Sequence, residues 1–211
     1  MKAFDGVFET HLTVRLPGRL GEGDEGLARW AERHEMKYAM ILLDRGATPQ
    51  QPMLTYHRLG MLPAQLVLAR RRVGELCGAG FDVVRVKVEA APWNEDVPQS
   101  AVEASALMPG CYFEHHVKLV LADDAEVDAV RRIGTRHAGH VSRNARRGLD
   151  GGRHERFLTQ RCRLVGHPEA HRRLEALLDA LAHGAHHVIE VEEEFVVHDD
   201  NPGLDHGWAD A

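Results

Sequence analysis

The residues of this chain with the clearest capacity for chemistry are two Glu-x-His pairs, Glu9 with His11 and Glu114 with His116. The two pairs lie 105 residues apart in the sequence. An imidazole can act as a general acid or base near neutral pH, and imidazole together with carboxylate can bind a transition metal. Two matching pairs in one chain predict a site to which each half of the molecule contributes.

The chain is internally duplicated. Phe8–Val14 resembles Phe113–Leu119, and Val84–Glu89 aligns with Ile189–Glu194 at the same offset of 105 residues. Two matches at one offset, framing segments of similar pattern, indicate a repeated structural unit. We therefore expect the two halves to share one fold.

Hydrophobic periodicity predicts the order β-α-β-β-α-β in each half. In the first half the expected strands are 7–16, 38–43, 53–59 and 81–90, and the expected helices are 26–35 and 62–76, with a glycine-rich loop over 17–26. In the second half the expected strands are 112–121, 140–147, 156–164 and 188–197, and the expected helices are 125–137 and 168–183. This pattern is typical of a ferredoxin-like unit, in which two helices cover one face of an antiparallel sheet.

The predicted fold class is therefore α+β, a tandem duplicated ferredoxin-like (βαββαβ)2 chain with pseudo-twofold symmetry. The first repeat spans 1–97, a linker rich in turn residues spans 98–110, and the second repeat spans 111–211. Because the helices of each unit cover only one face of its sheet, the two bare faces or their edges should meet and form a central cleft.

Strand alternation turns the Glu-x-His pairs toward this cleft. With Phe8 and Leu12 facing the helices, Glu9, His11 and Thr13 point to the opposite face of the first strand. The corresponding residues of the second repeat are Glu114, His116 and Lys118. By the same alternation His115 faces the helices, where a structural role is expected. The row of Glu190, Glu192 and Glu194 on the last strand is expected to be solvated.

The tetrapeptide that begins at His11 has the form His-apolar-Thr-apolar, which resembles the motif of the two-histidine phosphoesterase superfamily, the RNA ligase-like and cyclic-phosphodiesterase enzymes. The tetrapeptide that begins at His116 has Lys118 where that family has Thr or Ser. The resemblance implies a hydrolase acting on a cyclic phosphate or phosphodiester, of a nucleotide or an RNA end, with no cofactor. It implies that the two histidines are the general base and general acid, and that Thr13 and Lys118 hold the phosphate.

The strands of the second half also carry many arginines that the first half lacks. Arginine binds phosphate or carboxylate through two parallel hydrogen bonds, so arginines on the cleft side could hold an anionic substrate. Alternation favours Arg143, Thr159 and Arg161 as substrate ligands. The alternative is that these arginines protect an exposed strand edge against further sheet pairing.

Other interpretations of the site stay open at this stage. Glu9, His11, Glu114 and His116 could together bind a divalent metal such as Zn, Fe or Mn in a metal-dependent enzyme. A non-catalytic anion-binding module would use the arginines alone. A Glu-x-His pair on a strand also occurs as a purely structural cross-strand contact.

Composition limits the classes of partner and location. The 211 residues are 44% hydrophobic and 27% charged, as in an ordinary globular domain, and the net charge of −6 does not favour duplex DNA. No apolar run is long enough to cross a membrane and no signal peptide is evident, so we expect a cytoplasmic protein with no membrane partner. The three cysteines have no metal-binding spacing. Glycine-rich phosphate loops, Gly-x-Ser-x-Gly and His-Glu-x-x-His motifs are absent from the sequence.

Overall fold

Each half of the chain folds as a βαββαβ unit in the computed structural model, which describes residues 4–16, 24–147, 149 and 153–208. The elements of the first unit are β1 Asp5–Arg15, α1 Asp24–Arg33, β2 Lys37–Leu43, β3 Gln50–Met61, α2 Leu62–Gly78 and β4 Asp82–Ala90. Helix α1 begins at Asp24, within the expected loop, and residues 17–23 of that loop lie outside the described residues.

The second unit repeats this order. Its elements are β5 Tyr112–Leu121, α4 Asp124–Arg136, β6 Gly139–Asn144, β7 His154–Arg163, α5 His167–His183 and β8 His187–Asp199. The expectation of a duplicated ferredoxin-like α+β fold is confirmed. The expected linker contains a short helix, α3 Ala101–Ser105, and the chain continues after β8 into a 3-10 turn, η1 Pro202–Asp205.

Local sequence explains where the helices begin. Helices α2 and α5 start 105 residues apart, and each has proline in its first turn, where the missing N–H costs no helical hydrogen bond. Helix α4 is capped by Asp123, whose carboxylate accepts a hydrogen bond from the backbone N–H of Glu126 at 2.9 Å. The duplication is thus visible at the level of helix starts as well as strands.

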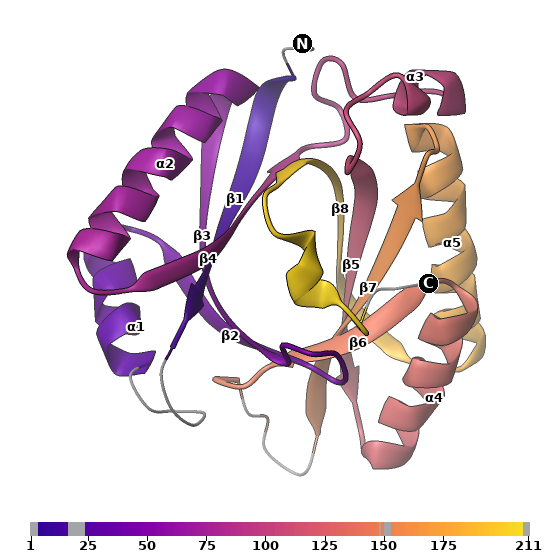
Figure 1. Ribbon diagram of the computed structural model, residues 1–211. Coiled ribbons are helices and arrows are strands. Elements are labelled where there is room, and N and C mark those ends of the chain that lie inside the picture. Colours follow the sequence, from indigo (N-terminus) through magenta and orange to yellow (C-terminus); the bar gives the residue numbers. More distant parts are fainter. Residues whose placement is uncertain (1–3, 17–23, 148, 150–152, 209–211) are drawn as a thin grey trace.

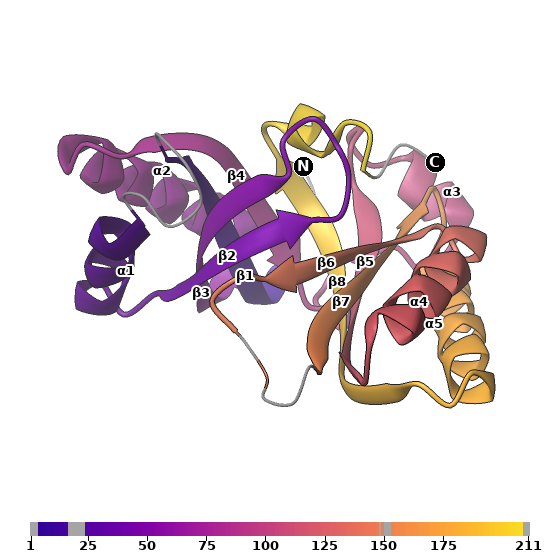
Figure 2. The same cartoon turned by 90° about the horizontal axis from the view of Figure 1, so that it is seen from below.

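The two four-stranded sheets join at both edges into one closed barrel, in the order β1-β3-β2-β6-β7-β5-β8-β4. Strand β2 pairs with β6 and β4 pairs with β8, and both pairings are antiparallel. Figure 1 shows α1 and α2 on one side of the barrel and α4 and α5 on the other, and the view from below in Figure 2 shows the strands enclosed between these helix pairs. Closure leaves no sheet edge unpaired at these two junctions.

The two faces of the strands are buried in different surroundings, one against the helices and the other inside the barrel. Between barrel and helices lie two hydrophobic clusters, one centred on the first unit with Phe8, Leu12 and Leu54, the other on the second unit with Val117 and Leu158. The opposite face of each strand points into the barrel, where most of the buried residues are polar or charged, with Tyr112 and Val196 among them. Residues 10 to 14 of β1 are consequently all buried, although their side chains alternate between an apolar and a polar surrounding.

The bare faces of the two sheets meet at the centre of the molecule, as the sequence predicted. The interior is filled by side chains over most of its length, because closing the sheets brings the two polar faces into direct contact. The interior opens to solvent toward one end of the barrel, near the start of β1 and the end of β4.

Candidate functional site

The two histidines of the Glu-x-His pairs both point into the barrel, and each is held by the same kinds of partner. His11 on β1 is 2.8 Å through Nδ1 from the hydroxyl of Thr55 on β3, and 2.5 Å through Nε2 from the carboxylate of Glu89 on β4. Only 7% of His11 is exposed. Burial disfavours its charged form, but the neighbouring carboxylate of Glu89 outweighs this and raises the pKa of His11.

The second repeat reproduces this arrangement. His116 on β5 is 3.1 Å through Nδ1 from the hydroxyl of Thr159 on β7, and 3.4 Å through Nε2 from the carboxylate of Glu194 on β8. Its Nε2 also lies 3.3 Å from Glu114. Against the effect of burial, hydrogen bonds to these two carboxylates raise the pKa of His116 well above its ordinary value. Two Thr-His-Glu triads therefore face the interior of one barrel.

The histidines and glutamates in the barrel also form two sets of potential metal ligands, each with residues from both repeats. Glu9 and His11 of the first repeat lie with Glu194 of the second, and we call this set A. Glu114 and His116 of the second repeat lie with Glu89 of the first, and we call this set B. In each set the three ligand atoms lie within 4.8 Å of one another. Each set thus combines one Glu-x-His pair with a glutamate from the last strand of the other repeat.

Set B is neutralised by permanent cations. The ammonium of Lys87 lies 2.8 Å from Glu89 and 2.6 Å from Glu114, and the Arg161 guanidinium donates to the second oxygen of Glu114 at 2.5 Å. Although burial opposes ionisation, Arg161 and Lys87 hold the pKa of Glu114 well below its usual range. Lys87 and the charge of His11 likewise outweigh burial and lower the pKa of Glu89 to about 2. Both carboxylates of set B are therefore ionised and fully paired.

Set A has neither of these cations. Strand pairing places His57 opposite Glu9, in the position that Arg161 takes opposite Glu114, and the two residues are 3.1 Å apart. The position that corresponds to Lys87 in the second repeat is the exposed Glu192. Burial and the nearby charge of Glu89 raise the pKa of Glu194 to about 8. Glu194 is therefore mostly protonated at neutral pH, because burial and the charge of Glu89 outweigh the opposing effect of His116.

An acidic pocket of about 350 Å³ opens onto set A at one end of the barrel. It is reached at the start of β1 and the end of β4, and its charged lining consists of Glu9, His57, Glu89, Glu192, Glu193 and Glu194. The exposed side chain of Trp93 lies at its rim, 77% exposed. Set A is thus accessible from solvent.

The opposite end of the barrel is closed by the segment that follows β8. Asp205 of η1 lies 3.0 Å from Arg85 and 2.8 Å from Arg161, and it accepts a hydrogen bond from Gln51 at 3.0 Å. Asp199 pairs with the same Arg85. Figure 1 shows this segment in yellow, crossing in front of the strands between the two halves. The end that lies next to set B is therefore occupied by ion pairs.

The predicted phosphate ligands do not gather into one anion site. Arg161 is inside the barrel but is bound to Glu114 and Asp205, and Thr159 is bound to His116. Lys118 lies 3.4 Å from Glu190 and 3.7 Å from Glu155. Arg143 is exposed on β6, away from the histidines in the barrel, and Thr13 is buried two residues beyond His11 on β1. Both Lys87 and Arg161, the cations nearest the histidines, already have carboxylate partners.

Sequence reasoning missed Glu89, Glu194, Thr55 and His57. The signal for the two glutamates was present, because Glu89 and Glu194 are equivalent positions in the repeat. The expectation that Glu194 is solvated is wrong: its side chain is 12% exposed, whereas that of Glu190 is 53% exposed. His115 faces the helices as expected, with no exposed surface, and burial lowers its pKa.

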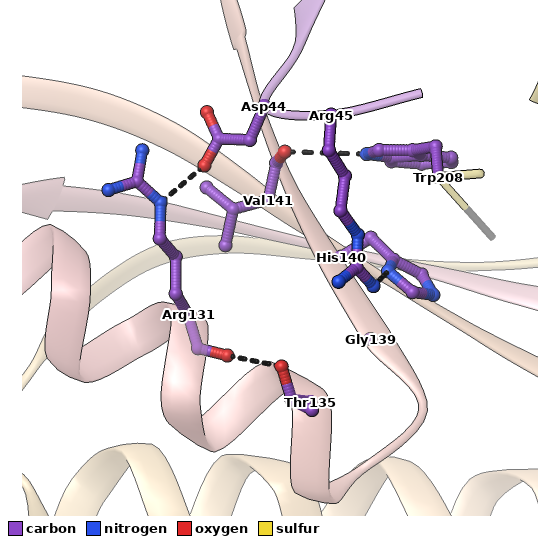
Figure 3. Close-up of a pocket in the computed structure, with 8 residues that line it drawn as sticks. All are labelled: Asp44, Arg45, Arg131, Thr135, Gly139, His140, Val141 and Trp208. Atoms are coloured by element: carbon purple, nitrogen blue, oxygen red, sulfur yellow. Dashed lines mark hydrogen bonds and ion pairs between the residues drawn. The ribbon is translucent and has the colours of Figure 1, made fainter. Parts of the chain in front are cut away.

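A second pocket, of about 190 Å³, lies outside the barrel near the junction of β2 and β6. Figure 3 shows its lining: Arg131 donates to Asp44 at 2.6 Å, Arg45 lies 2.7 Å from His140, and the Trp208 indole bonds to the Val141 carbonyl. These contacts connect the two repeats across the strand junction. The two arginines that line the pocket, Arg131 and Arg45, thus have partners within the protein itself.

No protein-family model matches this sequence, and no curated protein matches it. Among solved structures, the acetolactate synthase small subunit from Thermotoga maritima is 10% identical, with a TM-score of 0.30, covering 89% of this chain and 92% of that one. A putative chlorite dismutase is 15% identical, with a TM-score of 0.30 and coverage of 91% and 95%. A mutant chlorite dismutase from Candidatus Nitrospira defluvii is 14% identical, also at 0.30, with coverage of 91% and 92%.

These findings correct the resemblance drawn from the sequence. The structures found are not two-histidine phosphoesterases, and the His-apolar-Thr-apolar pattern at His11 does not place the chain in that superfamily. A pattern of four residues on an amphipathic strand arises readily from alternation alone, which explains the false match. Within the described residues no helix has both the length and the apolar character that crossing a membrane requires.

Proposed function

We propose that this protein is a metal-dependent hydrolase that binds one divalent transition-metal ion through Glu9, His11 and Glu194. The observation that carries the proposal is the contrast between the two ligand sets. The same ligand types converge twice in the barrel, but set A lacks the lysine and arginine of set B, and two of its residues, Glu9 and Glu194, line the pocket. A divalent ion would supply in set A the positive charge that Lys87 and Arg161 supply in set B.

The ligand chemistry suits such an ion. One imidazole and two carboxylates match Zn²⁺, Mn²⁺ or Fe²⁺ and leave coordination positions for water and substrate. Thr55 on the far nitrogen of His11 fixes the orientation of the ring, as outer partners of metal-binding histidines do. An ion in this position would lower the pKa of a bound water molecule and polarise a substrate carbonyl.

His57 is placed to move a proton in this reaction. It lies at the pocket, its side chain is 51% exposed, and its Nε2 is 3.1 Å from Glu9. An imidazole that is both open to solvent and bonded to a metal ligand can accept a proton from bound water and release it to bulk solvent. Its counterpart in the second repeat, Arg161, cannot lose a proton.

The acidic lining favours a neutral or cationic substrate. Five glutamates line the pocket, Glu9, Glu89, Glu192, Glu193 and Glu194, with no lysine or arginine among the residues that line it. An anion would be repelled by this field unless the ion compensated it. The hydrolysis of a cyclic phosphate therefore stays a prediction with less support from the site, since the lining of the pocket offers no lysine or arginine to hold the phosphate.

Metal binding by set A can be tested with Mn²⁺, whose preference for carboxylates separates set A from histidine-rich sites. Protein without a histidine tag, freed of metal with a chelator, should bind one Mn²⁺ ion, counted by the loss of the free-ion spin-resonance signal. Glu194→Gln should weaken this affinity by about 100-fold or more, because it removes a direct ligand. Glu192→Gln, two residues away on the same strand, should leave it unchanged. Equal binding by both variants, or no bound Mn²⁺ in the wild type, contradicts the proposal.

The reaction can be tested with two chromogenic substrates of different charge. The wild type loaded with Mn²⁺ should hydrolyse p-nitrophenyl acetate, a neutral ester, and Glu194→Gln should lose this activity, while Glu190→Gln, on the same strand but outside the pocket lining, should keep it. Bis(p-nitrophenyl) phosphate, an anionic diester, should be a poor substrate. Hydrolysis of the diester that persists with chelator and disappears in His11→Ala would instead favour acid-base catalysis by the histidines.

A further inference from the structure

A second cluster of histidines lies outside the barrel, beneath helix α5. It consists of His115 on β5, His167 and His171 on α5, and Glu193 on β8. Glu193 is its centre: one carboxylate oxygen is 3.7 Å from His167 Nε2 and 3.8 Å from His115 Nε2, and the other is 3.0 Å from His171 Nδ1. Glu193 points away from the barrel interior, in the opposite direction to Glu194, because strand neighbours alternate.

The hydrogen bonds of His115 set which of its nitrogens carries the proton. The Gln160 side-chain amide donates to the backbone carbonyls of His137 and Arg173, so its oxygen is left as the acceptor for His115 Nδ1 at 2.9 Å. His115 therefore donates from Nδ1, and its Nε2 presents a lone pair toward Glu193. A lone pair facing a carboxylate is unfavourable unless a positive charge lies between them.

The Nε2 atoms of His115 and His167 are both buried and lack a hydrogen-bond partner. The His115 side chain is completely inaccessible. Buried polar atoms are normally satisfied, because leaving one without a partner costs on the order of 1–3 kcal/mol. Two such atoms aimed at one carboxylate indicate a missing common partner.

The first repeat has no ionisable side chains at the equivalent positions. Helix α2 begins 105 residues before α5, and the residues equivalent to the cluster are Thr10, Leu62, Leu66 and Val88. The three apolar members pack into the hydrophobic core. The second repeat therefore has ionisable side chains where its counterpart has apolar packing, a change that weakens the fold unless the polar atoms gain a strong interaction.

We propose that His115, His167, His171 and Glu193 bind one zinc ion that ties α5 to β5 and β8. Three imidazoles and a carboxylate complete a tetrahedral shell, the usual arrangement of a closed zinc site. The ligand atoms of His167, His171 and Glu193 all lie within 4.8 Å of one another, and His115 Nε2 reaches this group through Glu193, 3.8 Å away. Ligand atoms of a tetrahedral zinc site lie roughly 3.4 Å from one another. His167 and His171 are four residues apart and so share one face of the helix.

Outer contacts support the same assignment. Glu175, one turn further along α5, lies 3.7 Å from Nε2 of His171, the nitrogen that does not face Glu193. Gln160 holds the outer nitrogen of His115 in the same manner. Such partners orient the imidazoles of metal sites. The site shares no ligand with set A, although Glu193 is also among the residues that line the acidic pocket.

The test uses a variant that copies the first repeat, His167→Leu with His171→Leu, which replaces the histidines with the leucines found at the equivalent positions of α2. Metal-free, untagged protein is titrated with Zn²⁺ against a chromophoric chelator, and melting temperatures are measured with and without Zn²⁺. The wild type should bind Zn²⁺ both at this site and at set A, Glu194→Gln should keep only the zinc of this site, and Zn²⁺ should raise the melting temperature of both proteins. The double variant should lose this zinc and its thermal shift while staying folded without metal.

His183→Ala provides the matched control, because His183 is exposed on the same helix and lies outside the cluster. It should bind zinc as the wild type does. Co²⁺ in place of Zn²⁺ should give the intense visible absorption of a tetrahedral complex in the wild type and not in the double variant. Zinc binding that survives the double substitution, or wild-type protein that binds no zinc outside set A, overturns the proposal.

Discussion

Sets A and B are the same arrangement of glutamate and histidine placed twice in one barrel, yet they have opposite electrostatic states. In set B, Lys87 and Arg161 neutralise Glu89 and Glu114, and Asp205 covers the adjacent end. In set A the equivalent positions are Glu192 and His57, and the adjacent end is a pocket. Two pairs of equivalent positions, Lys87 with Glu192 and Arg161 with His57, thus give one copy an internal ion network and leave the other without a lysine or arginine.

The largest expected effect comes from removing the cation of set B. Lys87→Met leaves Glu89 and Glu114 buried without their shared partner, which should lower the free energy of unfolding by about 3–5 kcal/mol. Glu192→Gln at the equivalent position should change it by less than about 0.5 kcal/mol, because that side chain is exposed. Urea unfolding in the presence of chelator measures both. A loss below about 1 kcal/mol for Lys87→Met would show that set B does not depend on its lysine.

Neutralising the equivalent glutamates should affect stability in opposite directions. Glu89→Gln breaks contacts with Lys87 and His11 and should cost about 3 kcal/mol at pH 7. Glu194→Gln replaces a carboxyl group that is mostly protonated in the folded protein, so this variant should be at least as stable as the wild type. Unfolding curves recorded at pH 7 without metal make the comparison, and equal losses in both variants would remove the distinction between the sets.

The pH dependence of stability should separate the sets as well. In set B the pKa of Glu89 lies below its ordinary value of 4.5, so its contribution is present above pH 4.5 and is lost as the pH falls toward 2. In set A the pKa of Glu194 is raised from 4.5 to about 8, so its contribution is present below pH 4.5 and is lost as the pH rises to 8.

Between pH 5 and 8 the wild type should therefore lose stability relative to Glu194→Gln by on the order of 1 kcal/mol per pH unit. The measurement is the difference between the two unfolding free energies across this range, with chelator present throughout. Parallel curves for the two proteins would mean that Glu194 ionises at its ordinary pKa in the folded state.

The smallest effect is expected for the arginine outside the barrel. Arg143 is exposed on β6 and is remote from both ligand sets, so Arg143→Gln should change stability and Mn²⁺ affinity by less than about 0.5 kcal/mol. Arg161→Gln, by contrast, removes a partner of Glu114 and Asp205 and should destabilise the protein markedly. A strong effect of Arg143→Gln would restore the interpretation that this residue binds a substrate.

Much of the fold was predictable because it rests on local patterns. The offset of 105 residues indicated the duplication, and the periodicities gave the order of elements in each repeat. Alternation along β1 and β5 also placed Glu9 and His11 on the face opposite to the helices, where the structure has them. These predictions needed only the residues of one strand and the two-residue repeat of its side chains.

The surroundings of Glu194 could not be predicted in this way. Glu190, Glu192 and Glu194 form one alternating row on β8, and only their place relative to β4 distinguishes them. Strand β4 pairs with β8 from Phe195 to Asp199, so Glu194 lies directly beside the paired stretch, whereas Glu190 and Glu192 lie further past the end of β4. This register belongs to a contact between repeats, and no pattern within β8 encodes it.

Two equivalent units, each with a glutamate and a histidine on the face of its sheet away from the helices, follow from the residue pattern alone. Three features depend on contacts between the repeats: the closure of the two sheets into a barrel, the glutamate of the other repeat that completes each Glu-x-His pair, and the place of Lys87 within set B. These two kinds of feature differ because alternation is a property of a single strand, whereas the pairing of buried charges depends on strands that are far apart in the sequence and become neighbours when the barrel closes.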